Sequence, residues 1–253
     1  MLRAAGSLSL PVGDRFGVQA DVMGNFSPSS TVFGGALHAF TRDPSRYLLG
    51  VTAGVVVQPG QATLAALGAE GELYLDRISL EGWAGIASLN YVNPAMLDLT
   101  GAFAIGDLAY YPTDNLRVSV GGSYLLGDLS LHAATEYQFD GPGGSPLSLT
   151  GDARLHTSGN YTLTVGLKGY FGGDPSKSLI DRNRQDDPPN RALDLYGAGG
   201  SLMAEQPAGA CEPSFSSEPT ISLTCFPDDP EQFCIDNGFD DYNPGTGECY
   251  HYS

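Results

Sequence analysis

The sequence contains no run of about 18 apolar residues, the length that a helix needs to cross a bilayer, so helical membrane spans are excluded. Charged residues are scarce as well, at 16% of the chain, which is unusual for a soluble enzyme. One class of membrane protein passes both tests, because only every second residue of a transmembrane β-strand meets lipid. A β-barrel is therefore compatible with both absences.

Basic residues are fewer than acidic ones, 12 against 29, and the formal net charge is −17. Such a chain repels nucleic acid, and no basic patch with interleaved aromatic residues is found, so we expect no nucleic-acid partner. The acidity is uneven: residues 1–173 hold 14 acidic and 8 basic residues, whereas residues 174–253 hold 15 and 4. The C-terminal part is thus the acidic part of the chain.

Cysteine is absent from the first 210 residues and occurs at four positions after them: Cys211, Cys225, Cys234 and Cys249. An even, clustered set predicts two disulfides formed in an oxidising compartment, with three connectivities open. The spacing lacks Cys-x-x-Cys pairs, so no zinc site is expected. Four nearby acidic residues could offer oxygen ligands to calcium, but their spacing is not that of an EF-hand: Asp236, Asp240, Asp241 and Glu248. We interpret them as a solvated acidic surface and expect neither a metal nor a cofactor.

What the sequence does have is alternation with a period of two residues. In residues 161–171, YTLTVGLKGYF, apolar side chains alternate with Thr, Gly and Lys, as on a strand with one apolar and one polar face. Aromatic residues stand at both ends of this stretch, where a membrane strand has its interfacial anchors. We interpret it as the last strand of a membrane barrel.

The same alternation recurs through the first 171 residues. It predicts eleven strands, at residues 2–12, 16–26, 31–42, 47–57, 62–75, 78–89, 101–111, 116–126, 129–139, 147–156 and 161–171. The predicted fold class is all-β, a transmembrane up-and-down antiparallel barrel. Bacterial single-chain barrels have even strand numbers, so we expect about twelve strands natively, with a twelfth strand and an export signal ahead of Met1.

The end of the barrel resembles a known group of proteins. The final strand with its continuation, VGLKGYFGG and then KSLIDRNRQDDPPN, is similar to the C-terminal portion of uncharacterised, porin-like outer-membrane β-barrel proteins of proteobacteria, over residues 161–190. Thr164, Gly166 and Phe171 fit the barrel-assembly signal, whereas Gly169 departs from it. The resemblance implies the bacterial outer membrane and its assembly route, with no activity attached.

Three segments follow from these patterns. Residues 1–173 are predicted to form the barrel, residues 174–210 a polar linker rich in Pro and Gly, and residues 211–253 a small acidic tail stapled by its cysteines. If the last strand ends on the periplasmic side, most short turns fall on that side as well, as expected for such barrels. The tail is then predicted to be periplasmic.

Charged side chains fall mainly on the face opposite the apolar rows. We expect the following residues to line the lumen: Arg3, Asp21, His38, Glu70, Glu72, Glu81, Asp107, Arg117, His132, Glu136, Asp152, Arg154 and Lys168, with His156 on the same face. They could line a polar channel, but barrel interiors commonly hold charged groups that pair with one another.

Three functions stay open at this point. The first is a structural barrel, or a narrow porin-like passage for small solutes, whose partners are outer-membrane lipids. The second is a scaffold that binds a protein partner through the tail or the loop at residues 90–100. The third is a lipid hydrolase, because His156 and Ser158 resemble the His-x-Ser arrangement of outer-membrane lipid A deacylases. That family also needs an acidic residue in the next strand, and residues 161–171 contain none. We therefore expect that this protein is not an enzyme.

Overall fold

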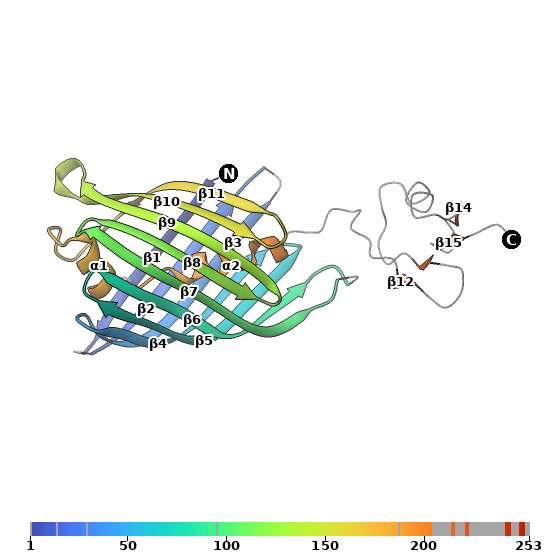
Figure 1. Ribbon diagram of the computed structural model, residues 1–253, viewed down its shortest axis with the longest axis horizontal. Helices are drawn as coiled ribbons and strands as arrows, with labels where there is room; N and C mark the ends of the chain where they lie inside the picture. The colour runs from blue at the N-terminus through green and yellow to red at the C-terminus, as the bar shows by residue number, and fades with distance from the viewer. Residues whose placement is uncertain are drawn as a thin grey trace. The chain divides into compact units, whose positions relative to one another are not determined.

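The computed structural model describes residues 2–203 except Asp14, Ser29, Ala95 and Asp187, and four short strands beyond them. Eleven antiparallel strands form one sheet in which each strand pairs with its neighbour in sequence. The sheet curls around an interior, which we call the lumen (Figure 1). The predicted all-β, up-and-down architecture is confirmed.

All eleven predicted strands are present, with ends within two residues of the predicted ones. They are β1 (Leu2–Val12), β2 (Phe16–Phe26), β3 (Thr31–Asp43), β4 (Tyr47–Gln58), β5 (Ala62–Leu75), β6 (Ile78–Tyr91), β7 (Leu99–Thr113), β8 (Leu116–Leu125), β9 (Asp128–Asp140), β10 (Pro146–His156) and β11 (Tyr161–Gly169). A 3₁₀ turn, η1 (Pro142–Gly144), lies between β9 and β10. The predicted turn at Gly127 lies one residue earlier than expected, because Leu126 and Gly127 both have positive φ, 50° and 101°, as a two-residue hairpin turn requires.

Side-chain alternation divides the sheet into two unlike faces. The outer face exposes large apolar side chains, with Leu37 at 68%, Leu67 at 63% and Ile86 at 65%. Leu67 is paired across the ladder with Ile86, so these exposed rows continue from strand to strand. The inner face buries polar and charged side chains together with a small apolar core. This polarity is the reverse of a soluble β-sandwich, whose apolar residues face inward.

The two edges of the sheet are β1 and β11. Within the described part of the chain, β1 is paired with β2 and β11 with β10, and no pairing joins β1 to β11. Leu8 of β1 and Leu163 of β11 are 63% and 74% exposed. The expected twelfth strand stays a prediction.

The strand connections gather at the two ends of the sheet. At one end, called the turn end, the connections are residues 13–15, 44–46, 76–77, 114–115 and 141–145. At the opposite end, called the loop end, they are residues 27–30, 59–61, 92–98, 126–127 and 157–160. The longest connection, residues 92–98, is thus at the loop end.

After β11 the chain folds back into the lumen, which differs from the linker predicted for residues 174–210. Two helices occupy this segment, α1 (Leu179–Gln185) and α2 (Arg191–Met203). Residues 98–203 belong to the same compact unit as residues 1–92. The cause is a set of apolar side chains at helical spacing, including Ala192 and Leu195, which the inner wall buries completely. Neither helix is long and apolar enough to cross a membrane.

A second compact unit consists of residues 93–97 and 204–253. Its described parts include β12 (Ser214–Phe215), β13 (Ile221–Ser222), β14 (Asp241–Asn243) and β15 (Glu248–Tyr250), paired in the order β12-β13-β15-β14. The four cysteine side chains, and therefore the predicted disulfides, lie outside the described residues. The same holds for the four acidic side chains considered for calcium.

The outer face yields a matched test of membrane burial on one strand. Leu67 is central in β5, whereas Leu75, 48% exposed on the same face, ends the strand at the turn end. Arginine costs about 2–4 kcal/mol on the lipid face at the bilayer midplane and about 0–1 kcal/mol near the interface. Leu67→Arg should therefore lower the free energy of unfolding in lipid vesicles far more than Leu75→Arg, measured by denaturant titration. Equal effects of the two substitutions would contradict a lipid-facing outer surface.

Candidate functional site: the barrel lumen

The polar residues predicted to face the lumen share the inner face of the sheet, in varying degrees of burial. Asp21, His38, Glu70, Glu72 and Arg154 are buried. The remaining eight are partly buried: Arg3, Glu81, Asp107, Arg117, His132, Glu136, Asp152 and Lys168. What the structure adds is the identity of their partners, several of which belong to the segment after β11.

The most buried cluster is centred on His38 of β3. Its Nε2 lies 2.7 Å from Oδ2 of Asp21, and its Nδ1 lies 3.0 Å from Oε1 of Glu70. All three side chains are fully shielded from solvent. Asp21 and Glu70 come from β2 and β5, so the cluster joins strands on both sides of β3.

Arg191, the first residue of α2, adds a cation to this cluster. Its backbone N–H donates to Oδ2 of Asp21 at 2.8 Å, and its Nε donates to Oε2 of Glu70 at 3.3 Å. Its Nη1 donates to Asp194 one helical turn later, at 2.8 Å. Arg191 is 1% exposed. Removing one partner of a buried ion pair is strongly destabilising, by about 3–5 kcal/mol, so this contact anchors the start of α2 in the lumen.

Beyond Arg191, α2 packs against the apolar part of the wall. Leu195, Ala198 and Met203 are at most 1% exposed and belong to the main hydrophobic cluster. Trp83 of β6 lies in the same cluster and contacts the ring of Phe103 edge to face, with centroids 4.7 Å apart. The single tryptophan is thus a packing residue of the filled lumen.

Glycine lets the helix approach the wall closely. A Cβ placed on Gly199 would lie 2.3 Å from Leu64 and 2.8 Å from Leu125, so only a residue without a side chain fits unless these neighbours move. Gly197 packs against the guanidinium of Arg154. Gly197 and Gly199 of α2 therefore lie close against side chains of the wall.

The helix α1 is fixed at the turn end. Its Leu179 N–H donates to Oδ1 of Asn115, in the β7–β8 turn, at 3.1 Å. Arg184 donates to the carbonyl of Ile78, the first residue of β6, at 3.1 Å. Tyr170 donates to Glu136 nearby, and burial raises the pKa of the Tyr170 phenol to about 12.

The other end of the segment is fixed at the loop end. Tyr91, the last residue of β6, donates to the carbonyl of Leu202 at 2.7 Å. Ser201 donates to Oδ2 of Asp128, the first residue of β9, at 2.8 Å. The helix α2 thus leads from the middle of the lumen to the loop end (Figure 1).

Further ion pairs line the wall around these helices. Arg117 lies 2.8 Å from Glu81, and His132 lies 2.6 Å from Asp107. The weaker pair of Lys168 with Glu136, at 3.6 Å, lies near the turn end. In these contacts the inward-facing charges pair with one another, as expected from the sequence.

The two residues considered for lipid hydrolysis are not brought together by any hydrogen bond of the described residues. Nδ1 of His156 lies 2.8 Å from Oδ2 of Asp128 and 3.2 Å from Oγ of Ser201. Ser158 instead accepts a hydrogen bond from Asn160 at 3.2 Å. Ser201 is no substitute, because a catalytic triad needs the serine and the acid on opposite ring nitrogens. The geometry gives no support to the hydrolase hypothesis.

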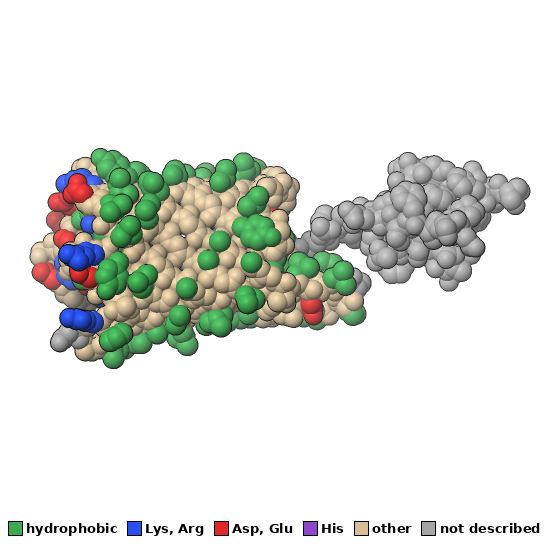
Figure 2. Space-filling model, turned by 60° about the horizontal axis from the view of Figure 1, so that its bottom comes forward, with side chains coloured by type: hydrophobic (Ala, Val, Ile, Leu, Met, Phe, Trp, Pro, Cys, Tyr) green, Lys and Arg blue, Asp and Glu red, His purple; other side chains and the backbone are tan. Residues whose placement is uncertain are grey.

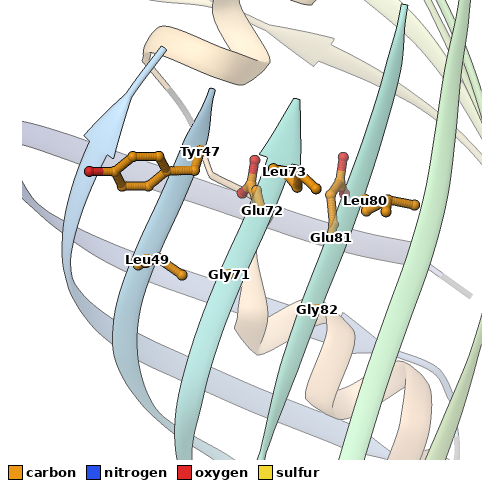
Figure 3. Close-up of a pocket in the computed structure, with 8 residues that line it drawn as sticks. All are labelled: Tyr47, Leu49, Gly71, Glu72, Leu73, Leu80, Glu81 and Gly82. Carbon is orange, nitrogen blue, oxygen red and sulfur yellow. The ribbon is translucent and has the colours of Figure 1, made fainter. Parts of the chain in front are cut away.

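Within the described residues, no group of three or more potential ligands is arranged to hold a metal ion. An open groove of about 480 Å³ lies on the outer face of β4–β6, where Gly71 and Gly82 leave a gap between larger side chains. Figure 3 shows Tyr47, Leu49, Leu73 and Leu80 around this gap. Glu72 and Glu81 also line the groove, and we assign it no function.

Comparisons with known proteins give little beyond the fold. No protein-family model matches the chain, and no curated protein matches it. The chain is similar to a solved structure of KdgM porin in complex with disordered oligogalacturonate, with 13% sequence identity and a TM-score of 0.49. The similarity covers 67% of this chain and 92% of the porin chain.

Residues of α2 such as Arg191, Asp194 and Tyr196 were not among those predicted to face the lumen. A local signal does precede them: Ser178 caps α1 by accepting from the N–H of Asp181, three residues later, which is a known helix-start pattern. In α2 the signal is weak, since three glycines lower helix propensity. The wall, rather than the local sequence, stabilises this helix.

Two adjacent glycines of α2 allow a matched test of the fit. A Cβ on Gly199 would collide with Leu64 and Leu125, whereas a Cβ on Gly200 would meet only the ring of Tyr196 at ordinary distances. Both substitutions replace Gly by Val, so they change the intrinsic helix propensity by the same amount. Gly199→Val should therefore expose the bond after Arg191 to trypsin in the folded barrel, while Gly200→Val leaves it protected. Equal cleavage of both variants would contradict this packing.

Proposed function

We propose that this chain is a bacterial outer-membrane β-barrel whose lumen is closed to solutes by its own α1 and α2, and which acts as a membrane anchor. The observation that carries the proposal is the position of α2. It contacts β2, β3, β4, β5, β8 and β9 from inside the sheet, with Arg191 buried among carboxylates. A filled lumen supports a structural barrel over an open passage.

The membrane location is supported by the outer face. Apolar side chains are spread over it, and most charged ones gather at the end that holds α1 (Figure 2). Exposed aromatic residues lie near both ends, as in the girdles of outer-membrane barrels: Phe16, Tyr110 and Phe139 toward the turn end, and Phe26, Phe33, Tyr124 and Tyr161 toward the loop end. Periplasmic turns are short and external loops longer in such barrels. By this rule the turn end faces the periplasm.

Single-channel recording in planar bilayers tests the closed lumen. The wild-type protein should give no steady conductance. Arg191→Glu places a carboxylate against Asp21 and Glu70, and this repulsion should expel the start of α2 and produce discrete channel openings. The matched control is Arg77→Glu, the same charge change at the exposed Arg77–Asp114 pair of the turn end, and it should stay closed.

Two outcomes separate the possibilities. Steady current through the wild-type protein would overturn the anchor proposal and favour an open porin-like passage. A heat-dependent shift in gel mobility shows whether each variant has folded, and Gly199→Val serves as a second opening variant if Arg191→Glu fails to fold. Zero current through a folded variant that has become sensitive to trypsin at residue 191 would contradict the role of α2 as the closing element.

A second candidate is a narrow passage that opens when α2 moves. The observation that favours it is the row of wall charges that pair without α2, namely Arg117 with Glu81 and His132 with Asp107. These pairs would line a polar path once the helix has left. Reversible openings of the wild-type protein under applied voltage would support this candidate, and a silent protein over the whole voltage range would exclude it.

A further inference from the structure

The segment after β11 enters the lumen at one end and reaches the other. At the turn end, Lys177 accepts a hydrogen bond from Gln138 through its carbonyl, at 2.8 Å, and Leu179 donates to Asn115. Farther from the turn end, the carbonyl of Pro188 accepts from Gln19 of β2 at 3.1 Å. At the loop end, Leu202 accepts from Tyr91. These contacts follow the chain in order along the axis of the sheet.

The length of α2 is sufficient for this path. Thirteen helical residues span about 20 Å at 1.5 Å per residue, and Arg191 already lies in the interior of the lumen beside Asp21. The last turn of the helix contacts the loop-end rim through Ser201 and Leu202. Residue 204 is bonded to Met203, so the chain continues from the loop end rather than from the end where β11 stops.

We propose that the barrel threads its own C-terminal segment and presents residues 204–253 on the membrane side faced by the loop end. This rests on the proposed function, and it replaces the periplasmic placement expected from the sequence. With the turn end in the periplasm, the cysteine-containing tail is displayed on the cell surface, and the barrel is the carrier and anchor of that segment.

The lumen is built to hold this one segment rather than to pass it freely. Arg191 is tied to Asp21 and Glu70 by buried contacts, and Gly199 fits between Leu64 and Leu125 where a larger residue would require these two side chains to move. A chain that merely rested in the opening would need neither feature. The threaded state is therefore a fixed arrangement of the folded protein.

Three epitope tags on the full chain test the topology. One tag follows Ser253, one is inserted after Ser158 in the loop-end connection, and one after Gly143 in the turn-end connection. Each variant is expressed with an export signal in Gram-negative cells, and an impermeant antibody is applied to intact and to permeabilised cells. The expected result is that the C-terminal and Ser158 tags are labelled on intact cells, whereas the Gly143 tag is labelled only after permeabilisation.

The outcomes distinguish this inference from the proposal on which it rests. If the Ser158 tag is labelled on intact cells and the C-terminal tag only after permeabilisation, threading is overturned while the outer-membrane anchor stands. If none of the tags is labelled on intact cells, the outer-membrane location fails and the inference fails with it. Labelling of all three tags on intact cells contradicts the assignment of the two ends to opposite sides.

A substitution in α2 tests whether the location of the C-terminal tag depends on the fit of this helix in the lumen. Gly199→Val, combined with the C-terminal tag, should lose most of its labelling on intact cells, because the Val side chain would collide with Leu64 and Leu125 at the place that α2 occupies. The Gly200→Val control should keep the wild-type labelling. Unchanged labelling of the Gly199→Val variant in a folded barrel would overturn the threading proposal.

Discussion

The interaction on which this structure most depends is the burial of Arg191 among carboxylates of the inner wall. A β-barrel with an apolar exterior has to place its polar residues inside, where each charge needs a partner. The wall alone pairs His38 with Asp21 and Glu70, and Arg191 adds the cation and N–H donors that complete this group. The segment after β11 is thereby part of the barrel's interior and not an appendage.

The strands could be predicted from the sequence because their information is local. Alternation with a period of two follows directly from strand geometry, and it gave every strand from Leu2 to Gly169 with nearly its observed ends. The same rule predicts that side chains such as those of Asp21 and Glu70 face the lumen. Their partners could not be derived, since they depend on ladder register and on a helix more than 100 residues later in the chain.

The helix α2 was missed for a physical reason. The stretch from Arg191 to Met203 contains three glycines, and the segment before it is polar and rich in Pro. This composition is typical of a linker. Glycine is unfavourable in an isolated helix, but here Gly199 is what allows contact with Leu64 and Leu125. The wall supplies the stability that the local sequence lacks.

Amide hydrogen exchange of the folded protein tests the central claim, that α2 fills the lumen, most directly. Amides from residue 195 to residue 203 should exchange as slowly as those of the central strands β4–β6, because buried, hydrogen-bonded groups open only with the surrounding structure. Exchange within seconds, at the rate of an exposed linker, while the strands stay protected would contradict it.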